Sequence, residues 1–103
     1  MRTLEFIVNG QKLQKKPECD FSGLVKGTRG YLNAAFIFGD GWEECGKIAV
    51  FYKCGKEYPV EIQTDRCMIP DSVLENDIFM ISLVGIKENY RICTNKVEVR
   101  QYG

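Results

Sequence analysis

The chain has 103 residues, of which 45% are hydrophobic and 27% are charged, a balance typical of a folded globular domain and not of a disordered segment. Lysine plus arginine equals aspartate plus glutamate at 14 each, so no net charge would attract nucleic acid or an anionic membrane, and we expect neither as a partner. The length predicts one domain over residues 1–103 with a single hydrophobic core.

The first predicted elements form an N-terminal hairpin over residues 1–14. Apolar and polar side chains alternate from Thr3 to Asn9, which is the pattern of a half-buried strand. Asn9-Gly10 then favours a type I′ turn, and residues 11–14 would return antiparallel to the first strand. This N-terminal segment lacks the apolar stretch of a secretory signal, so we expect synthesis in a cytoplasm.

Residues 15–30 are predicted to form a long loop. The segment is polar, contains Pro17 and several glycines, and shows no sustained period, with at most a short turn at residues 21–25. The main strands are expected in residues 31–101. The first of them, residues 31–38, alternates until Gly39-Asp40-Gly41 breaks the pattern.

A second hairpin is predicted from Gly46 to Ile62, with its turn at Cys54-Gly55. Its second arm contains Pro59, which has no amide to donate to a neighbouring strand. We therefore expect this arm to lie at the edge of a sheet, or to turn that position toward solvent.

The C-terminal third is predicted to contain the only helical turn and the central strand. Pro70 followed by Asp71 suits the start of a single helical turn. Residues 77–86 are apolar on both faces, which is typical of a central strand. In residues 90–101 the apolar positions change parity, and this change predicts a bulge near Thr94-Asn95.

The spacing of these elements predicts the fold class. About eight short strands separated by turn signals favour an all-β fold, an antiparallel β-sandwich with one short helical turn. A barrel or an α/β fold agrees less well with that spacing.

The residues that carry chemistry predict binding rather than catalysis. The sequence has no histidine, which removes the usual general base and every Ser-His, Cys-His and His-metal arrangement. Its five cysteines form no C-x-x-C pair, so we interpret them as reduced thiols and not as zinc ligands. No glycine-rich phosphate-binding motif is present. We expect no enzyme activity, no metal site and no cofactor.

Residues 36–51 resemble a known kind of module. They contain a phenylalanine-rich strand, an acidic turn that ends in Trp42, and then Lys47 and Ala49-Val50-Phe51. This order is similar to that of small immunoglobulin-like domains in the tail, baseplate and fibre proteins of phages that infect Gram-positive bacteria. The similarity continues through Cys67 to Leu74 and through the segments 83–86 and 92–97, so it covers roughly residues 30–100.

The resemblance implies an immunoglobulin-like β-sandwich with a structural role in a phage. It implies synthesis in the host cytoplasm, with the virion as a further location. It also implies that Trp42 closes one end of the core rather than stacking on a ligand. Because such modules usually belong to long fibre or baseplate chains, the sequence is either one domain of such a chain or a free-standing phage product.

Two predicted strands carry apolar side chains on both faces, and one sheet face cannot bury both sets. The spare face includes Ile48 and Val50 from one strand and Met80 and Val84 from the other. We expect the loop at 15–30 to cover it, or else another subunit, either a second copy or a different phage protein. The candidate interface residues are Ile48, Val50, Tyr52, Tyr58 and Tyr90.

The sequence leaves three functions open. The first is a phage structural or adaptor protein of the tail, baseplate or fibre that binds another phage subunit. The alternative is an inhibitor that binds a bacterial host or defence protein inside the infected cell. The second alternative is a carbohydrate-binding module, in which Tyr52, Tyr58 and Tyr90 would supply the stacking faces.

Overall fold

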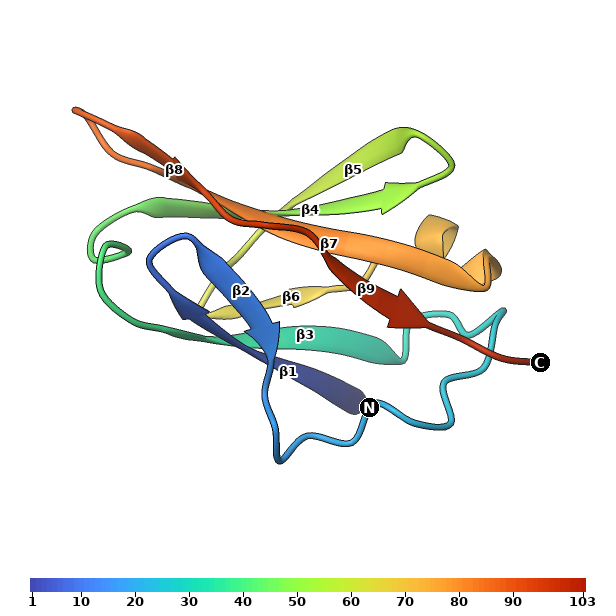
Figure 1. Cartoon of the computed structure of the whole chain (residues 1–103). Coiled ribbons are helices and arrows are strands. Elements are labelled where there is room, and N and C mark those ends of the chain that lie inside the picture. Colours follow the sequence, from blue (N-terminus) through green and yellow to red (C-terminus); the bar gives the residue numbers. More distant parts are fainter.

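Two β-sheets packed face to face form the computed structural model, which describes residues 1–103 (Figure 1). The prediction of an all-β sandwich is confirmed. The strands are β1 (Arg2–Asn9), β2 (Lys12–Lys15), β3 (Leu32–Phe38), β4 (Gly46–Lys53), β5 (Lys56–Glu61), β6 (Arg66–Met68), β7 (Ile78–Ile86), β8 (Arg91–Cys93) and β9 (Val97–Arg100). The predicted helical turn is present as a 3₁₀ helix, η1 (Asp71–Glu75).

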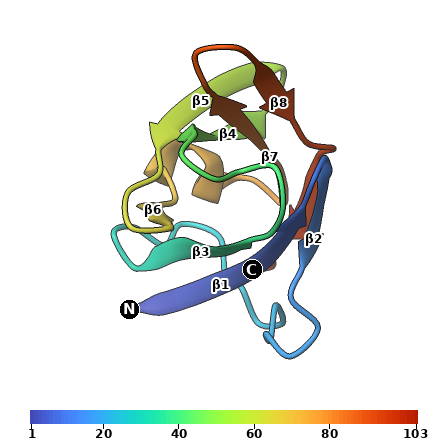
Figure 2. The ribbon, with the colours of Figure 1, turned by 90° about the vertical axis from the view of Figure 1, so that its left-hand side faces the viewer.

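The strand order follows the plan of an immunoglobulin-like sandwich. One sheet has the order β2-β1-β3-β6, and the other has the order β5-β4-β7-β8, with β9 also paired to β7. β3 and β6 therefore oppose β5, β4, β7 and the C-terminal strands, as strands B and E oppose C′, C, F and G in that plan. Figure 2 shows the two sheets from one end, one above the other.

β1 and β3 are parallel, whereas we expected only antiparallel pairs. Their register runs from Arg2 beside Leu32 to Val8 beside Phe38. The N-terminal hairpin is the cause, because β2 returns the chain toward the start of β1, and residues 16–31 then lead into β3 beside that start (Figure 1).

The first hairpin is confirmed, but its turn lies one residue later than predicted. Asn9 pairs with Lys12, so the two turn residues are Gly10 and Gln11. Of these two, only Gly10 has a positive φ, at 56°. Glycine at the first turn position is the pattern of a type II′ turn, so the predicted type I′ turn is wrong.

The second hairpin, β4 with β5, is confirmed. Cys54 (φ 49°) and Gly55 (φ 79°) both lie in the left-handed region, which is the type I′ pattern. Pro59 lies on β5, the edge strand of its sheet. The Ile62 amide donates to the Lys47 carbonyl, so by alternation the backbone nitrogen of Pro59 points away from β4. Proline at this position therefore removes no hydrogen bond from the sheet.

The loop predicted at 15–30 is present but begins at residue 16, because Lys15 still belongs to β2, and it lies against β1 (Figure 1). The ring of Phe21 contacts that of Phe6, with the centroids 5.4 Å apart, and Cys19 Sγ accepts a hydrogen bond from the Glu5 amide. The outer side of the sheet β5-β4-β7-β8 is on the opposite side of the molecule. The expectation that this loop covers the spare apolar face is therefore wrong.

Trp42 closes one end of the core, as expected. It is 1% exposed, and its indole N–H donates to the Gly10 carbonyl at 2.7 Å. Its ring lies over Gly85, where a Cβ atom would come within 2.7 Å of it. The indole is thus enclosed and has no free face for a ligand.

The predicted bulge in the last segment is confirmed. Val84 pairs with Cys93, and Ile81 pairs with Val97. Between these pairs β7 has two residues and the returning chain has three, residues 94–96. One extra residue shifts the inward positions by one, which accounts for the change in parity.

Candidate protein interface

The pleat of β4 and β7 separates their side chains into two apolar sets. The inward set is fully buried and consists of Ala49, Phe51, Phe79, Ile81 and Leu83. The outward set, which we call the outer apolar face, consists of Ile48, Val50, Tyr52, Ile78, Met80, Val84 and Ile86. No strand, helix or loop backbone lies over this outward set (Figure 1).

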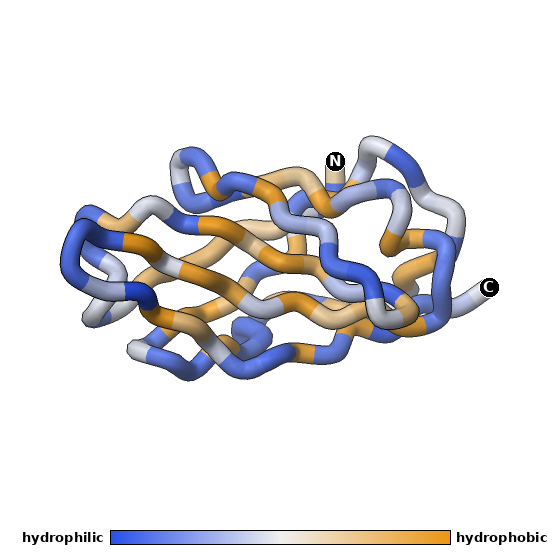
Figure 3. Tube along the Cα trace, turned by 90° about the horizontal axis from the view of Figure 1, so that it is seen from above, coloured by the Kyte–Doolittle hydropathy of each residue, from blue (hydrophilic) through white to orange (hydrophobic).

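The register of β4 and β7 joins the outward side chains into a stripe that Ser82, beside Val50, interrupts on β7. Ile48 lies beside Val84 in adjacent strands. Exposure ranges from 9% at Val50 to 48% at Ile86. Figure 3 looks onto this sheet from outside, and hydrophobic residues follow both of its central strands. A stripe of neighbouring apolar residues differs from the single apolar residues that are normal on protein surfaces.

Tyr52 is fixed within the outer apolar face by two contacts. Its hydroxyl is hydrogen-bonded to the hydroxyl of Ser82 at 2.7 Å, which satisfies a buried polar group on β7. Lys96 Nζ lies 4.2 Å from the centre of the tyrosine ring, within the range of a cation–π contact. Lys96 therefore holds a positive charge over the face at this point.

One border of the outer apolar face is acidic. Glu57 of β5 is in register with Tyr52, and Glu61 is in register with Ile48, so both carboxylates extend on the outer side. Both glutamates are exposed. Pro59 lies between them on the same side of the strand.

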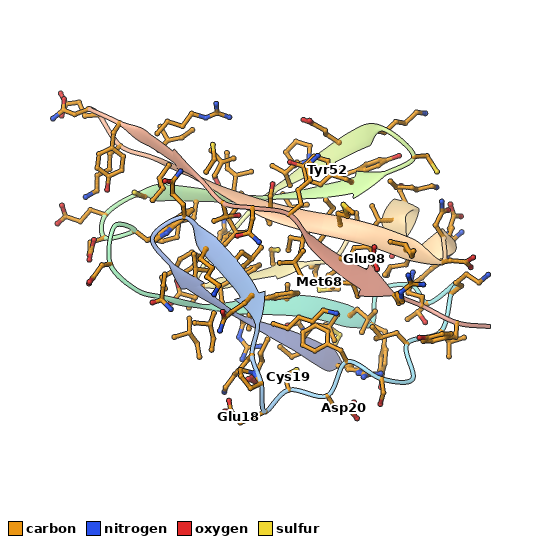
Figure 4. The ribbon with its side chains drawn as sticks, in the orientation of Figure 1. Glu18, Cys19, Asp20, Tyr52, Met68 and Glu98 are labelled. Atoms are coloured by element: carbon orange, nitrogen blue, oxygen red, sulfur yellow. The ribbon has the colours of Figure 1, made fainter.

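The opposite border is mainly basic. Arg91 of β8 and Arg100 of β9 are in register with outward residues of β7, and Lys96 lies between them in the chain. Glu98 also points outward, and its carboxylate is 3.2 Å from Arg100 Nε (Figure 4). Apolar residues at the centre and charged residues at the rim are the usual anatomy of a protein–protein interface.

A shallow groove of about 380 Å³ lies at the hairpin end of the outer apolar face. It combines apolar, acidic and basic side chains, among them Tyr52, Met80, Glu57 and Lys96. A groove with this lining can accept a side chain of a partner and hold charged groups at its rim.

The structure brings some of the candidate interface residues together and separates the others. Three lie side by side on β4: Ile48, Val50 and Tyr52. Tyr58 is on the inward side of β5, in register with Phe51, and packs against the core. Tyr90 lies in the turn between β7 and β8, where its hydroxyl donates to the Gly41 carbonyl at 2.6 Å. The three tyrosines therefore form no common surface on which a sugar could stack.

Sequence reasoning missed the partners of Tyr52. Ser82 is the one hydroxyl in the apolar run of β7, and that interruption was the available signal. Lys96 carried no signal, because its place over the ring follows from the bulge geometry of residues 94–96 and not from any pattern.

The structure contains no group of three or more Cys, Asp or Glu side chains arranged to hold a metal ion. All five cysteines are free thiols. No helix is long and apolar enough to cross a membrane.

No protein-family profile matches the chain, no curated protein is similar to it in sequence, and no solved structure matches it.

Proposed function

We propose that this chain is a non-enzymatic structural or adaptor module of a phage tail, baseplate or fibre, which binds another protein through the outer apolar face. In this proposal the protein is made in the host cytoplasm and incorporated into the virion. One observation carries the proposal: apolar side chains line the outer side of β4 and β7, and no strand, helix or loop backbone lies over these two strands.

Apolar side chains that remain in contact with water carry a free-energy cost. Large contiguous apolar patches rimmed by polar residues mark interaction sites, because burying them is favourable by about 25 cal/mol per Å². The inward faces of β4 and β7 already supply the core, so the fold does not require apolar residues outside. The outward residues Val84 and Ile86 therefore point to a role in binding.

The resemblance to phage modules supports the structural context of this binding. The residues that match the phage modules have structural roles in this fold. Trp42 closes the core, Ile69 is buried, and Thr94 and Asn95 form the bulge. These contacts explain why the same residues would recur in one type of sandwich. They support membership of that type, and the outer apolar face then supplies the docking surface.

The proposal is tested in particles of the phage that encodes the chain. Mass spectrometry of purified particles is expected to detect the chain in a fixed copy number. A photo-crosslinking amino acid at Val84 is expected to join the chain to a virion protein. The same group at Ile37, which is 52% exposed on the outer side of the other sheet, is the matched control and should give no such product.

Absence from the particles would overturn the virion role. If the Val84 crosslink then joined the chain to a bacterial protein, the inhibitor alternative would replace it. Equal crosslinking from Val84 and Ile37 would remove the outer apolar face as the docking surface.

A further inference from the structure

The two borders of the outer apolar face carry opposite charges of equal size. Glu57 and Glu61 place two negative charges along β5. The other border carries the positive charges of Arg91, Lys96 and Arg100 and the negative charge of Glu98, which leaves a net charge of two positive. A surface with this pattern is complementary to itself when one copy is turned so that opposite borders meet.

Only one symmetric arrangement of two copies achieves this match. When two sheets stack face to face with their strands aligned, a two-fold axis in the plane between them runs either along the strands or across them. An axis along the strands places β5 of one copy over β8 and β9 of the other. An axis across the strands places β5 over β5, so that Glu57 and Glu61 would face their own copies. Charge complementarity therefore selects the axis along the strands.

The shape of the sheet is compatible with the same arrangement. Both copies have the same right-handed strand twist, and two such sheets pack face to face with their strands roughly aligned. Pairing through the sheet edges is less favourable. Pro59 has no amide on the free side of β5, and the bulge at residues 94–96 interrupts the other edge.

We propose that the outer apolar face binds a second copy of this chain, forming a two-fold dimer whose axis runs along the strands. This inference rests on the proposed function, since it names the partner at the same face. A two-fold axis along the strands leaves the position of each residue along the strand direction unchanged, so residues at the same level in the sheet meet across the interface. Glu61 of one copy then lies opposite Cys93 of the other, between Arg91 and Lys96. Glu57 lies opposite Glu98, which is flanked by Lys96 and Arg100 and paired with Arg100, so the attraction at this level comes from the net positive charge of the border.

The first test measures the molar mass of the purified, reduced full-length protein by light scattering and sedimentation over a range of concentrations. The wild type is expected to be dimeric. Val84→Glu places a charge in the centre of the face and is expected to give a monomer with an unchanged far-UV spectrum. Ile37→Glu, on the other sheet, is the matched control and should remain dimeric.

The second test uses charge reversal to determine the orientation. The Glu57→Lys/Glu61→Lys variant and the Arg91→Glu/Arg100→Glu variant should each dimerise at least about tenfold more weakly than the wild type, because like charges then meet at the interface. Mixed in equal amounts, the two variants should form a heterodimer of near wild-type strength, since each altered border then faces its complement. Retained thermal unfolding transitions show that both variants fold.

Three results would overturn the dimer. These are a wild type that stays monomeric, a dimer insensitive to Val84→Glu, and charge variants that fail to recover on mixing. A monomeric wild type combined with a specific Val84 crosslink to another virion protein would leave the proposed function standing. The occupant of the face would then be a different protein.

Discussion

Asn95 joins the two sheets through the backbone of Leu13. Its Oδ1 accepts a hydrogen bond from the Leu13 amide at 2.8 Å, and its Nδ2 donates to the Leu13 carbonyl at 3.1 Å. The side-chain amide therefore satisfies both backbone groups of a residue on β2, an edge strand of the other sheet. This contact connects the bulge of the second sheet to the N-terminal hairpin.

Asn95→Asp is expected to destabilise the fold by about 1–3 kcal/mol, because the carboxylate keeps the acceptor but loses the donor to the Leu13 carbonyl. Denaturant unfolding monitored by Trp42 fluorescence measures this change. Asn89→Asp, in the exposed turn between β7 and β8, is the control and should change stability little. Equal stability of the two variants would mean that water replaces the Asn95 contact without cost.

The close approach of the Trp42 ring to Gly85 leads to a second prediction. A Cβ atom at position 85 would lie 2.7 and 2.8 Å from two atoms of the Trp42 ring and 2.9 Å from Ile92 Cγ2. Gly85→Ala is therefore expected to cost about 1–3 kcal/mol of stability through overpacking. Gly46→Ala is the control, because its nearest neighbour would be the Ile86 carbonyl at 3.8 Å, an ordinary contact.

A double-mutant cycle separates this clash from a general effect of alanine. Trp42→Phe alone loses the hydrogen bond to Gly10 and part of the core packing. Combined with Gly85→Ala, it is expected to cost less than the sum of the two single changes, because the smaller ring makes room for the methyl group. Additive costs would show that the strain at position 85 comes from the backbone.

The five thiols are expected to divide by accessibility. Cys54 and Cys93 are exposed, whereas burial raises the pKa of Cys67 to about 12. Because the thiolate is the reacting form, a thiol reagent at pH 8 should modify Cys54 and Cys93 first and leave Cys67 intact in the native protein. All five should react after unfolding. Rapid labelling of Cys67 in a Cys54→Ser/Cys93→Ser variant would contradict the packing around β6.

The local patterns of the sequence were sufficient for most of the fold. Alternation located the inward faces, and the changed parity after Cys93 located the bulge because one extra residue must shift every later side chain. Pro59 indicated an edge strand for a purely local reason, since it lacks an amide. Each of these signals resides in neighbouring residues and needs no information about distant ones.

The missed features depend on contacts between distant parts of the chain. No local pattern shows that β1 would lie beside β3 in parallel, because this depends on the path of residues 16–31. The same path places the loop against β1 and leaves the outer apolar face open. Lys96 over Tyr52 and Asn95 beside Leu13 likewise arise only once both sheets are assembled.

The ion pair between Lys26 and Asp77 predicts how stability changes with pH. Lys26 Nζ is 2.6 Å from Asp77 Oδ1, and its hydrogen bond and positive charge lower the pKa of Asp77 below the ordinary value of 3.8. Folding thus favours the ionised carboxylate, so the contribution is present above the ordinary pKa and is lost as the pH falls through the folded pKa. Asp77→Asn should lower the midpoint of thermal unfolding at pH 7, and the difference from wild type should narrow as the pH falls below 3.8.

Glu88→Gln, in an exposed turn, is the control and should show no such dependence. Because the pair is solvent-exposed, the effect is small and should shrink further in high salt. A difference that stays constant from pH 7 to pH 2 would show that Asn76 or the neighbouring backbone, and not the charge, is responsible.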